Sequence, residues 1–141
     1  MKSTVQIFSE LGERLLGFGT DEVSRSVVAR AVADNEWFSV GDIRYAVEAI
    51  RREMLDAEKI EKWLSHYPAL NSSDTLRVAL IMAGNIPLVG FFDLMCVLAS
   101  GNIPYVKPSS KDSILERYIE DLLLDIEPSL RIEKYREGIE Y

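Results

Sequence analysis

One short apolar run limits the possible folds more than any other feature of this 141-residue sequence. Residues Val78–Ala83 are all apolar and do not alternate with polar residues, as is typical of a strand covered on both faces of a parallel sheet. A helix is expected next, from about Leu88 to Ser100, with Pro87 in its first turn and Gly101 at its C-terminal cap. Ile103–Lys107 is expected to form a second strand. The connection is long enough for a right-handed crossover, so this region predicts a βαβ unit.

The residues that follow predict a further helix and a third strand. Ser109 and Asp112 have the spacing of a capping box, and the helix after them places on one face Leu115, Tyr118, Ile119, Leu122 and Ile126. Residues 130–135 are expected to add a strand. The opposite face of the helix carries Glu116, Glu120, Asp121 and Asp125. Such a charge pattern is usually solvated, which disfavours a hydrolase built on these carboxylates.

The first half of the sequence has the apolar spacing of helices. The residues with this spacing are Phe8, Leu11, Leu15 and Phe18, then Val23, Val27, Val28, Ala31 and Val32. A capping-box pattern at Ser39 and Asp42 predicts a third helix from about Val40, and a fourth is indicated by Ile60, Trp63, Leu64 and Tyr67. Pro68 and the polar residues 71–74 then interrupt the pattern.

These patterns predict an α/β fold in one compact domain with two regions. Residues 1–74 form a helical N-terminal region. Residues 75–141 form an incomplete Rossmann-like βαβ(αβ) unit with a short parallel sheet, which is a partial dinucleotide-binding unit.

Composition excludes several classes of function. The net charge of −7 and the pI near 4.8 disfavour nucleic acid, which is bound by clustered Lys and Arg. No apolar run approaches the roughly 20 residues that span a bilayer, and the N-terminus does not have a signal peptide's apolar core, so we expect no membrane span and a cytoplasmic protein. Because Cys96 and His66 are the sole residues of their types, we expect no disulfide and no Cys/His metal site; His66 is expected at the surface.

Asn85 and Lys107 are expected at the carboxyl ends of the two strands, where open α/β sheets bind ligands. An amide can donate to a developing oxyanion, and an ammonium can bind ribose hydroxyls or phosphate. From spacing alone, the simpler alternative is an Asn that fixes a turn and a solvated Lys. The tetrapeptide Gly-Asn-Ile-Pro occurs at residues 84–87 and 101–104, but the copies are expected at opposite edges of the sheet and predict no duplicated site.

Three stretches resemble a known family. They are AGNIPLVG at residues 83–90, LASGN at 98–102 and VKPSS at 106–110. Together they resemble the first dinucleotide-binding unit of the aldehyde dehydrogenase superfamily. The variant is most similar to the bacterial acyl-CoA reductases of the luminescence type, which reduce fatty acyl thioesters to aldehydes. That branch's helical N-terminal region also resembles this chain at Asn35, Trp37, Phe38, Arg44, Ala46 and Trp63.

The resemblance implies an N-terminal cofactor-binding portion of an NADPH-dependent fatty acyl-CoA reductase. Asn85 would be its catalytic oxyanion-hole amide. The remaining contacts to NADP(H) would come from the backbone of Ala83, Gly84, Asn85 and Ile86 and from Lys107, Ser109 and Ser110. Ser110 replaces the acidic residue of NAD-preferring relatives, and its hydroxyl can donate to a 2′-phosphate, so NADPH should be preferred.

Catalysis in this family requires a cysteine thiolate that attacks the acyl-CoA substrate. Cys96 lies in the apolar helix segment 91–98 and is expected to be a buried, unactivated thiol. We therefore expect the chain to stop before the family's catalytic cysteine and to be inactive alone. The alternative is a non-catalytic protein-interaction module derived from the same family. In either case an unfinished sheet edge or apolar faces predict a homo-oligomer.

Overall fold

The computed structural model describes residues 1–68 and 74–141 and confirms a mixed α/β fold with a helical N-terminal region. The first region contains α1 (Thr4–Arg14), α2 (Glu22–Asp34), α3 (Val40–Met54) and α4 (Ala57–Ser65). The second contains β1 (Arg77–Ile81), α5 (Phe91–Ala99), β2 (Ile103–Lys107), α6 (Ser113–Ile126) and β3 (Glu133–Lys134). The polar residues 71–73 of the predicted boundary lie outside the described residues.

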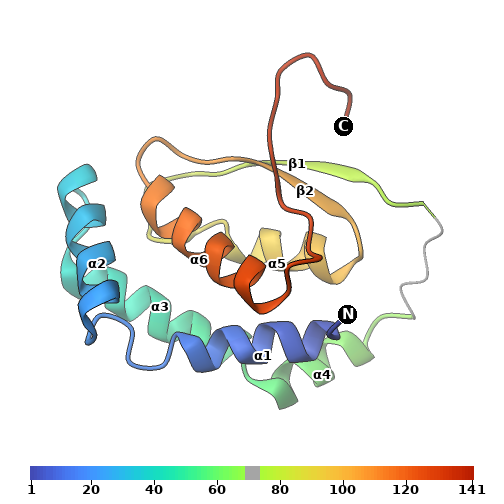
Figure 1. Ribbon diagram of the computed structural model, residues 1–141, viewed down its shortest axis with the longest axis horizontal. Helices are drawn as coiled ribbons and strands as arrows, with labels where there is room; N and C mark the ends of the chain where they lie inside the picture. Colours follow the sequence, from blue (N-terminus) through green and yellow to red (C-terminus); the bar gives the residue numbers. More distant parts are fainter. Residues whose placement is uncertain (69–73) are drawn as a thin grey trace.

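The elements form three layers (Figure 1). The sheet lies on one side, α5 and α6 lie beneath it, and α1, α3 and α4 form the opposite side, with α2 beside the start of α6. The strand order is β1-β2-β3 and both pairings are parallel, with register from Arg77↔Ile103 to Ile81↔Lys107. The predicted β1-α5-β2 crossover unit is therefore confirmed.

Strand β1 differs from the prediction in its bounds and its burial. It ends at Ile81 rather than Ala83, and it is partly exposed, with Ile81 63% exposed. The reason is its position at the edge of the sheet, where helices cover only one face. The strand that is buried on both faces is β2, because the C-terminal segment crosses its outer side (Figure 1) and places the ring of Tyr141 5.0 Å from that of Tyr105.

The connection between β1 and α5 is a turn, not the start of the helix that the sequence predicts. Helix α5 begins at Phe91, and Pro87 lies in the preceding turn. Leu88 has φ of 56°, in the left-handed region that a helix does not allow, and its N–H donates to Asp112 Oδ2 at 2.7 Å. The side chain of Leu88 nevertheless points into the core. The turn is thus anchored at both its backbone and its side chain.

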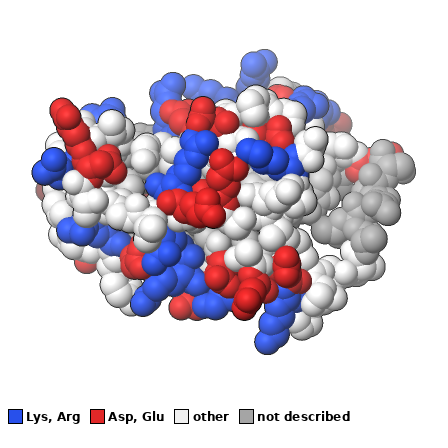
Figure 2. All heavy atoms as spheres, turned by 60° about the horizontal axis from the view of Figure 1, so that its bottom comes forward, with Lys and Arg blue, Asp and Glu red and all other residues white. Residues whose placement is uncertain are grey.

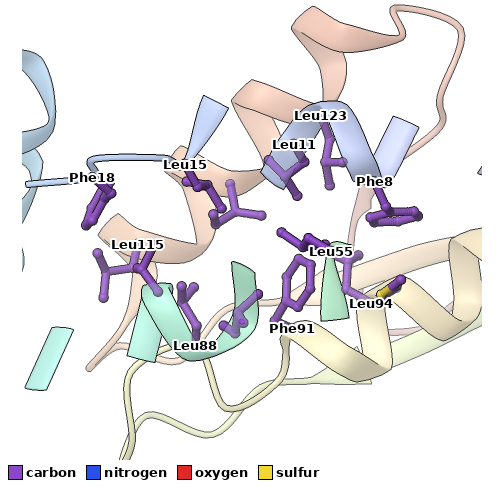
Figure 3. Close-up of a cluster of buried hydrophobic side chains, with 14 of the residues drawn as sticks. Phe8, Leu11, Leu15, Phe18, Leu55, Leu88, Phe91, Leu94, Leu115 and Leu123 are labelled. Carbon is purple, nitrogen blue, oxygen red and sulfur yellow. The ribbon is translucent and has the colours of Figure 1, made fainter. Parts of the chain in front are cut away.

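One hydrophobic core joins the two predicted regions (Figure 3). Phe8 and Leu11 of α1 lie against Leu94 and Leu123 from α5 and α6, and Phe8 meets Phe91 edge to face with 6.4 Å between ring centroids. Each such buried side chain contributes about 1.5–3 kcal/mol to folding. The predicted apolar face of α2 is correct for Val27, but Val23 is 67% exposed.

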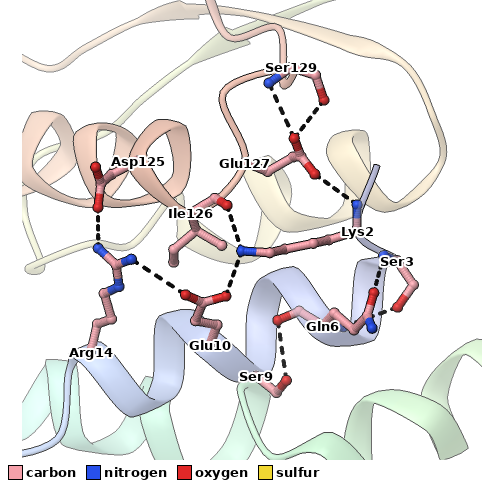
Figure 4. A network of polar contacts seen from close by, with 10 residues as sticks. All are labelled: Lys2, Ser3, Gln6, Ser9, Glu10, Arg14, Asp125, Ile126, Glu127 and Ser129. Carbon is pink, nitrogen blue, oxygen red and sulfur yellow. Dashed lines mark hydrogen bonds and ion pairs between the residues drawn. The ribbon is translucent and has the colours of Figure 1, made fainter.

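The N-terminus is fastened to the end of α6 by a polar network (Figure 4). The backbone N–H of Lys2 donates to Glu127 Oε1 at 2.7 Å, and Lys2 Nζ bonds both Glu10 Oε2 at 2.9 Å and the Ile126 carbonyl at 2.8 Å. Arg14 pairs with Asp125, also of α6. Hydrogen bonding to Lys2 lowers the pKa of both Glu10 and Glu127. These contacts fix α1 along α6.

The predicted helix starts have different outcomes. Ser39 caps α3 as expected, since its Oγ accepts from the Asp42 N–H at 3.0 Å. The capping box predicted from Ser109 and Asp112 is wrong, because α6 begins at Ser113 and its N-cap residue is Asp112 rather than Ser109. The Asp112 side chain makes no cap hydrogen bond and accepts from the Leu88 N–H instead. None of the helices within residues 1–68 and 74–141 has the length and hydrophobicity needed to cross a lipid bilayer.

Candidate functional site

Two loops meet at the carboxyl edge of the sheet. One follows β1 and contains Gly84, and the other follows β2 and contains Ser109 and Lys111. A Cβ at Gly84 would lie 2.1 Å from Ser109 Oγ and 2.6 Å from Lys111 Cβ, so an alanine does not fit without movement of the second loop. A residue without a side chain is therefore required where the two loops touch.

Asn35 links both loops to the helical layer. It follows α2, is 1% exposed, and its Nδ2 donates to the carbonyls of Gly84 at 3.2 Å and Lys111 at 2.9 Å. Its Oδ1 accepts from the Trp37 N–H at 2.9 Å. The sequence analysis named Asn35 only as part of the resemblance to the family's helical region. Nothing in its spacing predicts its contacts with Gly84 and Lys111, which lie 49 and 76 residues away.

The residues predicted to bind a ligand lie along these loops but not in one enclosed pocket. The exposed ones are Ala83, Asn85, Ile86, Lys107 and Ser110, while Gly84 and Ser109 are half-buried between the loops. Lys107 Nζ lies 5.9 Å from the ring centroid of Tyr135, on the side where the C-terminal segment crosses the sheet. Ser109 Oγ accepts from the Lys111 N–H at 3.0 Å. The structure thus brings Gly84 and Ser109 together.

The repeated tetrapeptide lies at opposite edges, as expected. Residues 84–87 follow the end of β1, whereas residues 101–104 lead into the start of the parallel strand β2. In the second copy Asn102 is used for structure, because its Oδ1 accepts from the Leu76 N–H at 2.9 Å.

Three acids on and before α6 are the most perturbed groups among the described residues. Burial raises the pKa of Asp112 to about 6 and is also the main cause for Glu116, which is raised to about 8 with help from the charges of Asp112 and Glu120. Glu120 is raised to about 6 by burial and then by Asp121. The prediction that the acids of α6 are solvated is therefore wrong for Glu116 and Glu120, because this face of the helix turns toward the sheet.

Asp121 and Asp125 do lie at the surface, as the sequence predicts for the four acids of this helix. Glu116 and Glu120 border a cavity of about 320 Å³ that α6 shares with β3. Asp121 also borders this cavity but is exposed, and Asp125 does not border it.

Cys96 is half-buried in α5, where burial and then the charge of Asp93 raise the pKa of its thiol. The thiol is thus less buried than the sequence predicts, and its raised pKa is the direction expected of a cysteine that is not activated. His66 lies at the surface at the end of α4, as expected, with Nδ1 2.7 Å from the Lys62 carbonyl.

The loops fit some parts of a dinucleotide better than others. Exposed Asn85 and Lys107 can offer an amide and an ammonium to ribose hydroxyls or a carboxamide. The helix N-termini, which would bind pyrophosphate, carry acids instead: Asp93 lies in the first turn of α5, and Asp112 directly precedes α6. A negative charge at a helix N-terminus repels phosphate, so the described residues fit the nucleoside ends of the cofactor and not its pyrophosphate.

Neither the surface charges nor the metal-binding side chains of the described residues mark a further site. On the face that Figure 2 shows, basic and acidic side chains are interspersed, without a broad area of either sign among the coloured residues. Within residues 1–68 and 74–141 no group of three or more His, Cys, Asp or Glu side chains could hold a metal ion.

Comparisons with known proteins gave no match, since no protein-family model, no curated protein and no solved structure matches the chain.

Proposed function

We propose that this chain provides the first βαβ half of an NADP(H) site in an acyl-CoA reductase of the aldehyde dehydrogenase type, and that it works in the cytoplasm. The observation that carries the proposal is the meeting of the two loops at the carboxyl edge, where Gly84 touches Ser109. Parallel α/β units bind nucleotides at this edge. Support from the sequence comes from the motifs at residues 83–90 and 106–110.

Each residue has a role that its chemistry allows. Lys107 binds the adenosine ribose, and Ser110 donates to the 2′-phosphate, where a carboxylate would repel it. Asn85 offers its amide to the oxyanion that forms when a thioester is attacked. NADPH, when bound, supplies the hydride that reduces the acyl group. The chain alone is expected to reduce no acyl-CoA, because the pKa of its single thiol, Cys96, is raised rather than lowered.

A second candidate function is a protein-interaction module. It is favoured by apolar side chains exposed beside the same edge: Ile81, Ile86, Val89 and Phe92, of which Phe92 is 42% exposed. Among the described residues β1 pairs only with β2, and a second copy could add a strand at its other edge to form the expected homo-oligomer. A sedimentation profile that stays monomeric at high concentration would contradict this assembly.

Calorimetric titration with NADPH and NADH tests the cofactor proposal. The wild type should bind both weakly, with NADPH preferred. Ser110→Glu should reverse the preference, and Lys107→Ala should weaken both by about tenfold, the loss of one charge-assisted contact. Lys62→Ala, which removes an exposed lysine from α4, serves as the matched control and should bind like the wild type.

Two results would remove the assignment of these residues. One is equal binding of both cofactors by the wild type, Ser110→Glu and Lys107→Ala. The other is thioester-dependent NADPH oxidation that is lost in Cys96→Ala, because that activity would make Cys96 the nucleophile.

A further inference from the structure

Two buried acids stand at the start of helix α6. Asp112 is 3% exposed and Glu116 is 6% exposed, and the charge of Asp112 raises the pKa of Glu116, so the two carboxyls lie near each other. Burying two like charges side by side is unfavourable, and apolar side chains usually fill such positions. The pair therefore needs an explanation of its own.

Most of the oxygens of this pair lack a full hydrogen bond within residues 1–68 and 74–141. They are Asp112 Oδ1 and both carboxyl oxygens of Glu116, and all three are closed off from solvent. The fourth oxygen, Asp112 Oδ2, accepts from the Leu88 N–H at 2.7 Å. Buried polar groups are nearly always hydrogen-bonded in folded proteins, so the three atoms indicate a further donor between them.

A proton on the pair supplies that donor. A protonated carboxyl has one O–H donor, whereas an ionised carboxyl only accepts. With Glu116 protonated and Asp112 ionised, the Glu116 O–H can donate to Asp112 Oδ1. The backbone N–H of Ser109 lies near enough to the Glu116 carboxyl to lower its pKa, and it is the donor for the remaining oxygen. One proton and one N–H thus account for all three atoms.

The backbone groups that face the pair belong to the two loops of the sheet edge. Leu88 lies in the loop that follows β1, and Ser109 lies in the loop that follows β2. These loops touch where a Cβ on Gly84 would lie 2.1 Å from Ser109 Oγ. Because Leu88 has φ of 56°, which is unfavourable for a leucine, its turn depends on the bond to Asp112. The pair is therefore placed to tie both loops to α6.

We propose that Asp112 and Glu116 share one buried proton, which Glu116 donates to Asp112 Oδ1, and that the pair in this state ties both loops to α6. The two acids are positioning residues, because both are buried and act on the sheet edge through Leu88 and Ser109. The consequence for NADP(H) binding rests on the proposed function, whereas the shared proton does not.

The two ionisations give this arrangement a pH window. Burial raises the pKa of Asp112 to about 6, and burial and then the charge of Asp112 raise that of Glu116 to about 8. The pair therefore holds two protons below about pH 6, one between about pH 6 and 8, and none above. Above about pH 8 the donor to Asp112 Oδ1 is lost and two buried carboxylates repel each other, so the loops should loosen.

Other charged groups lie near the pair. Those that border the same cavity as Glu116 are Arg117, Glu120 and Asp121 from α6 and Glu133 and Lys134 from β3. Lys111 adjoins Asp112 in the loop after β2, and Arg30 of α2 lines a groove at the start of α6. The neighbours from α5 and its preceding loop are the apolar residues Met82, Leu88, Phe91 and Leu94. Glu120 raises the pKa of Glu116 and has a raised pKa of about 6 itself, so the test has to resolve single residues.

Carbon-13 NMR of the side-chain carboxyls tests the shared proton without any ligand. The signals of Asp112 and Glu116 should each respond to both ionisations, with steps near about pH 6 and pH 8. Asp112→Asn should move the Glu116 step to lower pH, because it removes the neighbouring charge. Glu13→Gln, which changes an exposed carboxyl of α1, should leave both steps unchanged.

Hydrogen exchange of the Leu88 amide tests the link to the loops. At about pH 9 this amide should exchange at least about tenfold faster in the wild type than in Glu116→Gln, and at about pH 7 the two rates should agree within about twofold. The reason is that a glutamine amide donates to Asp112 Oδ1 as the protonated acid does, but it has no proton to lose at this pH. Thermal melting checks that the variants fold, and the wild-type carboxyl titration needs no variant.

Three results would overturn the proposal. They are carboxyl signals of Asp112 and Glu116 that each show one independent step, an unchanged Glu116 step in Asp112→Asn, or equal Leu88 exchange in the wild type and Glu116→Gln at about pH 9.

NADPH titration separates this proposal from the proposed function. Affinity should fall by about tenfold between about pH 7 and pH 9 in the wild type and stay constant in Glu116→Gln. If the carboxyl steps and the Leu88 exchange appear as predicted and NADPH binds at no pH, the nucleotide proposal fails and the shared proton stands. If NADPH binds with the same pH dependence in both proteins, the pair does not position the loops for the cofactor.

Discussion

The buried carboxyl of Glu116 makes the stability of this protein depend on pH in an unusual direction. Its pKa is raised from 4.5 to about 8, first by burial and then by the charges of Asp112 and Glu120. Between these two pH values the folded chain holds a proton that the unfolded chain has lost. The free energy of unfolding therefore falls as the pH rises through this window, the reverse of the usual behaviour of a paired carboxylate.

The size of the effect follows from the width of the window. Each pH unit corresponds to about 1.4 kcal/mol, so ionising Glu116 in the folded chain costs at most about 5 kcal/mol. Water entry and side-chain movement reduce such penalties, and we expect a loss of about 2–4 kcal/mol between about pH 5 and pH 9. Asp112 and Glu120, with pKa values raised to about 6, add to the loss only up to about that pH.

Urea denaturation of the wild type and of Glu116→Gln across this pH range measures the effect. The glutamine variant should lose little stability above about pH 7, because its side chain does not ionise. Glu13→Gln, which changes an exposed carboxyl of α1, is the control and should follow the wild-type profile. If Glu116→Gln loses stability as steeply as the wild type between about pH 7 and pH 9, Glu116 is not the buried acid and the reasoning is refuted.

Three further predictions concern the loops and the thiol. Asn35→Ala should lower the free energy of unfolding by about 2–4 kcal/mol, because it leaves buried carbonyls without donors, whereas exposed Asn85→Ala should change it by less than about 0.5 kcal/mol; urea titration compares them, and equal effects would contradict the role of Asn35 in linking the two loops. Gly84→Ala should cost about 2 kcal/mol or more and be partly rescued by Ser109→Gly, as a double-mutant cycle would show; additive losses would count against the contact. Cys96 should react with a thiol reagent at pH 8 more slowly than free cysteine, and a faster rate would contradict its raised pKa.

The elements that the sequence predicts well are those governed by local chemistry. The start of α3 at Val40 follows from the Ser39 cap, and β2 occupies Ile103–Lys107 as expected because it is short, apolar and bounded by Gly101 and Pro108. The parallel crossover follows from the length of the connection alone. The cap and the strand pattern act within a few residues, and the crossover within a single connection, so no tertiary information is needed.

The errors arise where a distant contact decides the outcome. Helix α5 starts late because the Leu88 N–H is bonded to Asp112, 24 residues away. The apolar run at β1 looks like a central strand, but its place at the sheet edge exposes Ile81. Glu116 was expected in solvent because the helical period fixes only which residues share a face, while tertiary packing decides that both sides of α6 are covered. The predicted site residues lie near one edge because they directly follow the ends of two parallel strands, β1 and β2. Asn35 reaches the same edge only through tertiary packing.

Amide chemical-shift mapping with NADPH tests the central proposal most directly, since it reports where the cofactor binds even when affinity is weak. The account predicts that the shifted amides cluster in residues 83–86 and 107–111 and that the shifts shrink in Lys107→Ala. Shifts confined to the cavity between α6 and β3, or none at several millimolar NADPH, would contradict the assignment of this edge as a nucleotide site.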